Sequence, residues 1–316
     1  MSSEFVIELF QKLKDKNLSD KSTNLYVKYL INLNNKEPFN NLMFLKNTDD
    51  ILKKLENYSD NTKKTILSAI TSILGLYKEE KAVYKKLHKF YFDLMMNKAT
   101  DMKNIDSSVK TEKENKNWIE WEEIITIRER LKNEVLEFVN NKIISVAQYN
   151  KLLSLLVLSL YTMIPPRRNV DYIEMYFVNQ YKDSLDSNKN YLDYKNKEFI
   201  FTNYKTSKKY GIQKIKIEVS LLDIIDLYLK HHPLNPDKKL SFKKNIEFRF
   251  LVFSDGSPFN LNSTTRLLNK LFDGKRIGSS MLRHIYLSSK YNIDEMKTDA
   301  DAMGHSLMEQ KSYMKI

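Results

Sequence analysis

Apolar side chains recur at helical spacing through the first 97 residues. In the stretch STNLYVKYLINL, the residues Leu25, Tyr29, Leu30 and Leu33 fall on one helical face. The later stretch DNTKKTILSAITSILGLY repeats the pattern with lysines on the opposite face, and its expected buried positions are Ile66, Ile70, Ile73, Leu74 and Tyr77. These patterns predict that residues 1–97 form a small, basic helical domain.

A polar segment follows this predicted domain. The sequence NKATDMKNIDSSVKTEKENKN, which starts at Asn97, has almost no apolar residues and the composition of an exposed linker. We therefore place the linker at residues 98–117. A second domain over residues 118–316 begins with the helical pattern WIEWEEIITIRERL.

The most apolar stretch, LLSLLVLSLYTMI, starts at Leu152 and is closed by Pro165 and Pro166. It spans about 14 residues, which is too short for a bilayer-spanning helix and indicates a buried helix. The N-terminal residues carry charges every few positions and lack the apolar core of a signal peptide. These features predict a soluble, intracellular protein.

The hydrophobic period changes after this buried helix. Apolar residues cluster at 199–201 and again at Ile212, Ile215, Ile217 and Val219, with a turn containing lysine and glycine between the two groups. This pattern predicts a β-hairpin or a short antiparallel sheet. Helical periodicity resumes at LLDIIDLYLKHH and continues to the C-terminus, apart from a turn near Gly256. The expected fold class is mainly α, with one small antiparallel sheet in the second domain.

Charge and composition narrow the functional classes. The 316 residues include 52 Lys and Arg against 40 Asp and Glu, which gives a formal net charge of +12. Such an excess suits a polyanionic partner such as nucleic acid, although a solvated lysine-rich surface explains it equally well. Cysteine is absent, so the chain has no disulfide, no thiolate nucleophile and no Cys-ligated zinc.

Two candidate phosphate-binding arginines, Arg167 and Arg168, directly follow the predicted buried helix. An arginine held at a helix end presents a rigid fork to phosphate oxygens, and Asp171 could brace it by an ion pair. An ordinary surface arginine pair is the alternative. Lys205 lies on the predicted hairpin turn, where it could donate a proton or simply belong to a solvated basic turn.

Three more candidates lie near the C-terminus. Arg283 and His284 are adjacent in a helical pattern and therefore about 100° apart, so at most one of them should face a given site. A buried Arg283 needs an anionic partner, which could equally be a structural salt bridge. His305 follows Gly304, which can supply a helix boundary. Tyr313 has an ordinary pKa of about 10, so it needs nearby cations or a base to act as a nucleophile.

In this order, these residues resemble the motifs of the tyrosine recombinases, the phage-type integrase family. Arg168 fits the first arginine box better than Arg167, because its spacing to Asp171 is three rather than four. The other boxes match the hairpin lysine Lys205 in YKTSKK, Arg283 in SSMLRHIYLSS, His305 in AMGHS and the terminal Tyr313. The residues PPRR and LRHIYLS are most similar to integrases of large eukaryotic DNA viruses, virophages and related mobile elements.

The resemblance implies a site-specific recombinase that forms a 3′-phosphotyrosyl link on Tyr313 without metal or cofactor. Arg168 and Arg283 would clamp the phosphate, Lys205 would protonate the leaving group and His305 would assist. Asp171 and His284 would have supporting roles. Ser280 occupies a position where the family has a basic residue, and the interval from His305 to Tyr313 is one residue shorter than in the family.

The same family also implies partners and a location. Double-stranded DNA would be held between the two domains, and four protomers would act on two duplexes. If a eukaryotic virus encodes the chain, it would work in the host nucleus or a viral replication compartment. Three alternatives stay open: a catalytically silent DNA-binding protein of this fold, a type IB topoisomerase or telomere resolvase, and an RNA-binding protein.

Overall fold

The computed structural model describes residues 4–103, 110–235, 240, 242, 246–289 and 293–304. The chain divides into two compact units, the N-terminal unit Met1–Asp106 and the C-terminal unit Ser107–Ile316. His305 and Tyr313 lie outside the described residues. Among the described helices, none is both long and apolar enough to cross a membrane.

The N-terminal unit is helical throughout its described elements. They are α1 (Glu4–Asp15), α2 (Asp20–Leu33), the 3₁₀ turn η1 (Met43–Lys46), α3 (Thr48–Glu56), α4 (Asp60–Tyr77) and α5 (Ala82–Lys103). The predicted buried face of α4 is confirmed, since all five of its expected positions are at most 2% exposed. In α2 the prediction is partly wrong: Leu30 and Leu33 are buried, but Leu25 is 39% exposed and Val27 is buried instead.

The predicted linker is more ordered than its composition suggested. Helix α5 continues to Lys103, and α6 (Glu112–Asn117) forms before Trp118. The Thr111 hydroxyl accepts a hydrogen bond from the Glu114 amide, and the Glu114 carboxylate accepts one from the Thr111 amide at 2.9 Å. This capping box stabilises a helix that carries almost no apolar side chains. Helical structure thus occupies both ends of the predicted linker, and the boundary between the two compact units lies within it.

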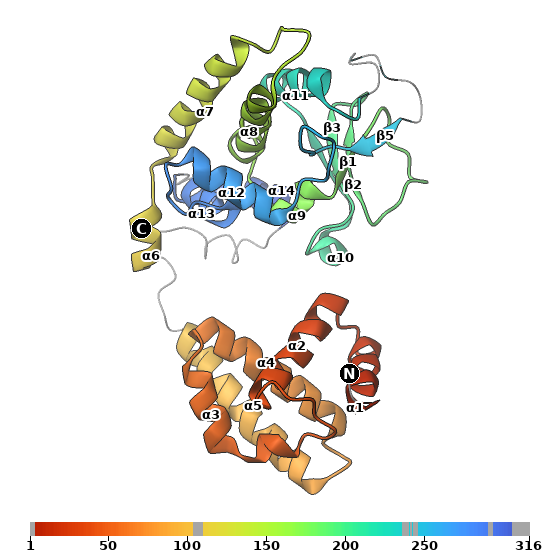
Figure 1. Cartoon of the computed structure of the whole chain (residues 1–316), viewed down its shortest axis with the longest axis vertical. Helices are drawn as coiled ribbons and strands as arrows, with labels where there is room; N and C mark the ends of the chain where they lie inside the picture. Colours follow the sequence, from red (N-terminus) through yellow and green to blue (C-terminus); the bar gives the residue numbers. More distant parts are fainter. Residues whose placement is uncertain are drawn as a thin grey trace. The chain divides into compact units, whose positions relative to one another are not determined.

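The C-terminal unit is built around helix α8 (Val146–Thr162), which starts at a capping box between Ser145 and Gln148. Every residue from Leu155 to Thr162 is buried, as the apolar run predicted. Figure 1 shows α8 in the middle of this unit. Its neighbours are α7 (Trp121–Leu136), α11 (Val219–His231), α12 (Leu261–Leu271) and α13 (Ser279–Ser289).

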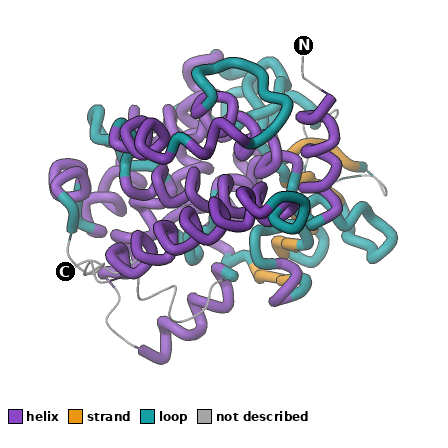
Figure 2. The backbone as a smooth tube through the Cα atoms, turned by 90° about the horizontal axis from the view of Figure 1, so that it is seen from below, coloured by secondary structure: helices purple, strands orange, loops and turns teal. Residues whose placement is uncertain are grey.

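The C-terminal unit also contains a small five-stranded sheet, whose strands are orange in Figure 2. The strand order is β4-β3-β2-β1-β5, with bounds β1 (Met175–Val178), β2 (Asn190–Asp193), β3 (Glu198–Phe201), β4 (Gln213–Lys216) and β5 (Glu247–Arg249). The predicted hairpin is confirmed, because β3 and β4 pair antiparallel. The sheet is nevertheless mixed rather than antiparallel, since β1 and β2 run parallel.

The sheet packs one face on the unit's main core. Phe177, Leu192 and Phe199 occupy matching positions on neighbouring strands, and all three are fully buried in that core. The remaining helices among the described residues of this unit are α9 (Asn169–Ile173), α10 (Ser207–Tyr210) and α14 (Ile293–Met303). The protein is thus mainly helical with a small mixed sheet, as its fold class predicted.

Candidate functional site

Two arginines, one buried and one half-buried, follow the C-terminal end of α8. Pro165 and Pro166 follow the helix, and Arg168 then serves as the N-cap residue of α9 with extended backbone angles. Successive side chains of extended backbone point to opposite sides. Accordingly, the Arg167 side chain is fully buried, whereas Arg168 is only half-buried.

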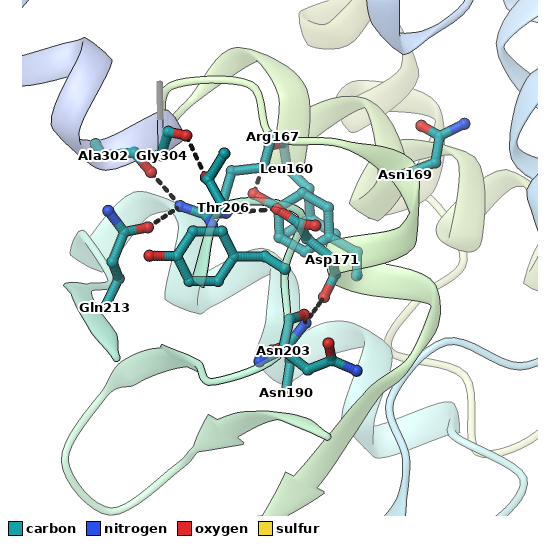
Figure 3. A network of polar contacts seen from close by, with 12 residues as sticks. Leu160, Arg167, Asn169, Asp171, Asn190, Asn203, Thr206, Gln213, Ala302 and Gly304 are labelled. Carbon is teal, nitrogen blue, oxygen red and sulfur yellow. Dashed lines mark hydrogen bonds and ion pairs between the residues drawn. The ribbon is translucent and has the colours of Figure 1, made fainter. Parts of the chain in front are cut away.

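Arg167 is the arginine that Asp171 braces. Its Nε donates to Asp171 Oδ2 at 3.0 Å, and neither side chain is exposed. Its Nη1 donates to Gln213 Oε1 at 2.8 Å and also to the carbonyl oxygen of Ala302 (Figure 3). Its Cζ lies 3.8 Å from the Phe201 ring centroid. The expectation that Asp171 braces Arg168 is therefore wrong, because a spacing in sequence does not tell which side of the backbone an arginine occupies.

A cluster of three arginines surrounds the single carboxylate of Asp171. Burial raises the pKa of Asp171 above its ordinary value, while the positive charges of Arg167, then Arg168 and Arg283, act in the opposite direction. We call Arg167, Arg168, Arg283 and Asp171 the arginine cluster. Guanidinium groups bind the oxygens of a phosphate in a bidentate fashion, so the arginine cluster is a candidate phosphate site.

Helix α13 supplies Arg283 to this cluster. Arg283 is buried, with 5% exposure, and its Nη1 donates to the Arg167 carbonyl oxygen at 3.3 Å. Its Nη2 donates to the Ser280 hydroxyl at 3.3 Å. His284 points elsewhere, with Nδ1 at 3.2 Å from Glu114 Oε1 of α6. The prediction that only one of these adjacent residues faces a given site is confirmed.

The predicted hairpin lysine lies in the connection between β3 and β4. Lys205 is exposed, but its neighbours are fixed, since Tyr204 is buried and its hydroxyl donates to the Gly211 carbonyl oxygen at 2.8 Å. Asn190 of β2 donates from Nδ2 to the carbonyl oxygens of Asn203 and Asp171, both at 2.9 Å. The loop that carries Lys205 is thereby joined to the helix that carries Asp171 (Figure 3).

The C-terminal end of α14 packs directly on this loop. Gly304 ends the helix with a φ of +69°, so the expectation that it supplies a helix boundary is confirmed. The Thr206 hydroxyl donates to the Gly304 carbonyl oxygen (Figure 3). A Cβ placed on Gly304 would lie only 2.7 Å from Tyr204 Cε2, so this close approach requires glycine.

Four predicted motif segments therefore meet within the C-terminal unit. Residues 167–171, the loop 204–206, Arg283 and residues 302–304 contact one another through the hydrogen bonds above, although up to 135 positions separate the partners. The segment 302–304 leads to His305, which lies outside the described residues, as does Tyr313.

Two residues that hold these segments together, Gln213 and Thr206, were not among the predicted site residues. A third, Arg167, was a candidate that fitted the first arginine box less well than Arg168. Gln213 Nε2 donates to the Asp301 carbonyl oxygen, so it bridges Arg167 and α14. Only the position of Thr206, directly after the hairpin lysine, offered a signal in the sequence.

A metal-binding group can be looked for in the same region. Within the described parts of the chain, no three His, Asp or Glu side chains are placed so that they could hold a metal ion.

Comparison of the chain with protein-family models and with curated proteins finds no match. The function must therefore be inferred from the site's own geometry.

Proposed function

We propose that the chain is a DNA strand-breaking and rejoining enzyme, a site-specific recombinase or integrase of the tyrosine recombinase kind. Its substrate is double-stranded DNA, and its reaction proceeds through a 3′-phosphotyrosyl intermediate on Tyr313. We further propose that four protomers act on two duplexes, in the host nucleus or a viral replication compartment.

The observation that carries the proposal is the convergence of the motif segments. Arg283 contacts the Arg167 backbone, Arg167 contacts the segment leading to His305, and that segment contacts the lysine loop. A set of weak sequence matches would not be expected to meet in space by accident. The net charge of +12 supports a polyanionic substrate in addition.

The geometry suggests a division of roles among the arginines. Arg167 is held by Asp171 through Nε and by Gln213 and the Ala302 carbonyl oxygen through Nη1, while its buried Nη2 has no partner among the described residues. We assign it a positioning role because these contacts hold it against the protein's own groups. Arg168 and Arg283 are the two proposed phosphate clamps, and they stabilise the charge that builds up in the transition state. Ser280 orients Arg283 by its hydrogen bond and does not replace the basic residue that the family has in that position.

The proposed reaction is a transesterification in which no external energy source is consumed. Tyr313 Oη attacks the scissile phosphorus and the bond from phosphorus to O5′ breaks. Lys205 donates a proton to O5′, and His305 accepts the proton of the tyrosine. A 5′-hydroxyl of a second strand then attacks the phosphotyrosine, restores a phosphodiester and releases Tyr313.

A covalent adduct tests this function without knowledge of the target site. A pool of duplexes with randomised sequence and a nick is incubated with the protein, so that the short 5′-hydroxyl product diffuses away after cleavage. Denaturing electrophoresis should then reveal a protein–DNA adduct for the wild type and none for Tyr313→Phe. An adduct of equal yield in both proteins would show that Tyr313 is not the nucleophile.

A catalytically silent DNA-binding protein is the second candidate. It is favoured by the presence of Ser280 where the family has a basic residue, because a serine hydroxyl cannot act as a general base at neutral pH. This candidate predicts duplex binding by both wild type and Tyr313→Phe, with no adduct from either protein.

A further inference from the structure

A polar cleft of about 500 Å³ lies beside the arginine cluster in the C-terminal unit. Its walls come from α6, the start of α9, α12 and the first turns of α13. We call it the α6–α13 cleft, and its lining residues are Thr111, Lys113, Glu114, Asn169, Thr265, Arg276, Gly278, Ser279, Ser280, Met281 and His284. Ten of these eleven described residues are polar or glycine, which does not suit an apolar small ligand.

Two exposed cations give the cleft its charge. Lys113 of α6 and Arg276 of the loop before α13 both line it. Within the described part of the chain, neither forms an ion pair. Among the described lining residues, the one carboxylate is that of Glu114, and it is already engaged: Oε2 accepts from the Thr111 hydroxyl at 2.8 Å, and Oε1 lies 3.2 Å from His284 Nδ1.

The walls of the cleft are held in place before any ligand arrives. The Arg276 amide donates to Asn117 Oδ1 at 2.7 Å, and Lys275 Nζ donates to the Trp118 carbonyl oxygen at 2.9 Å. These contacts fix the loop before α13 against the end of α6. A preformed cationic cleft loses less entropy on binding than a mobile one.

The cleft is continuous with the proposed catalytic site. Ser280 lines the cleft and accepts the hydrogen bond of Arg283, while Asn169 directly follows Arg168 in the chain. A strand whose scissile phosphate lies on Arg168 and Arg283 would therefore have its neighbouring phosphates close to Ser280 and Asn169. Serine, threonine, asparagine, lysine and arginine are the side chains that bind the DNA backbone.

We infer that the α6–α13 cleft binds the sugar-phosphate backbone of duplex DNA next to the scissile phosphate, with Lys113 and Arg276 as its phosphate-neutralising cations. This inference rests on the proposed function. It also gives α6 a role, because the helix contributes one of the two cations and holds the loop that contributes the other.

The test is the salt dependence of duplex binding. Each phosphate neutralised by a cation contributes about 0.9 to the slope of log Kobs against log salt concentration. The double variant Lys113→Ala/Arg276→Ala should therefore reduce that slope by about 1.8 and weaken binding by up to about 60-fold at 0.1 M salt. Fluorescence anisotropy with a labelled duplex measures both quantities for the full chain.

A matched control separates a local site from general charge. Arg130→Ala/Lys270→Ala also removes one arginine and one lysine, both exposed, from a different cleft between α7, α8 and α12. This control should leave the slope nearly unchanged. Circular dichroism of both double variants checks that the helical content is kept.

Each outcome has a distinct meaning. Equal slopes for the two double variants, or a wild-type slope for Lys113→Ala/Arg276→Ala, would overturn the cleft assignment and leave the proposed function standing. A wild type that binds RNA more tightly than duplex DNA, or binds no DNA, would overturn the proposed function itself.

Discussion

Substitution of Gly304 by alanine probes the contact that joins the C-terminal segment to the lysine loop. The residue has a φ of +69°, and an added Cβ would lie 2.7 Å from Tyr204 Cε2 and 3.1 Å from Thr206 Oγ1. Tyr204 cannot move away freely, because its ring is buried and its hydroxyl is bound to the Gly211 carbonyl oxygen. Either the loop or the end of α14 must shift.

The expected cost has two sources. The left-handed backbone costs an L-residue about 1–2 kcal/mol, and forcing a methyl group into a packed contact costs about 1–3 kcal/mol more. Together they predict that the free energy of unfolding falls by roughly 2–5 kcal/mol, which lowers the Tm of the C-terminal unit by about 4–20 °C. The smaller values apply if the end of α14 undocks and relieves the clash.

Tryptophan fluorescence is a selective assay for this unit. The chain has 2 tryptophans, and both, Trp118 and Trp121, belong to the C-terminal unit. Gly274→Ala is the matched control, since Gly274 has a φ of +81° but no atom within 4 Å of an added Cβ. If Gly304→Ala lowers the Tm no more than Gly274→Ala does, the proposed close packing on the lysine loop is refuted.

Three further predictions test other parts of the structure. Arg167→Ala should lower the free energy of unfolding by about 3–5 kcal/mol, because it leaves Asp171 buried without its main counter-charge. Adding Asp171→Leu to the same chain should recover part of this free energy, as measured by urea unfolding. Thr206→Val should lower the free energy of unfolding by about 0.5–1.5 kcal/mol, because it removes the hydrogen bond to the Gly304 carbonyl oxygen. It should also lower the yield of the protein–DNA adduct. Burial lowers the pKa of His88 in the folded chain below its ordinary value of 6.5. Because the unfolded chain then binds the proton more readily than the folded chain, the N-terminal unit should lose stability as the pH falls through and below 6.5. Urea unfolding followed by circular dichroism should show this loss in the wild type and a smaller one in His88→Gln.

Helical faces were the most predictable part of the fold. Burial of α8 and of the α4 face follows from apolar periodicity alone, because these helices present wide apolar surfaces to a core. The strands β1, β2 and β5 were missed, although β1 and β2 are as long as the predicted β3 and β4. In β2 all four residues are buried, including the polar Asn190 and Asp193, so no alternation reveals the strand.

The helix α6 could have been found in the sequence. Thr111 and Glu114 have the spacing of a capping box, which outweighs the polar composition of the segment around them. Composition alone indicates where apolar side chains are absent, and it does not distinguish an exposed helix from an extended linker.

For the candidate site, the sequence suggested which segments belong together but not how their side chains pair. The order of Arg168, Lys205 and Arg283 suggested a common site, and the structure brings their segments together. The choice of partner for Asp171 depends on which side of the backbone each arginine occupies. The bridging role of Gln213 depends on how β4 packs against α14, and the sequence pattern carries no information about such long-range contacts.

The most direct test of the account is the chemistry of the covalent adduct itself. Nicked duplexes labelled at the 5′ end of the cleaved strand are incubated with the protein, and the adduct is digested and mapped by mass spectrometry. The proposed mechanism requires that the labelled strand stay attached through its 3′ phosphate to the peptide that contains Tyr313. Attachment to any other residue, or retention of a strand labelled at its 3′ end, would contradict it.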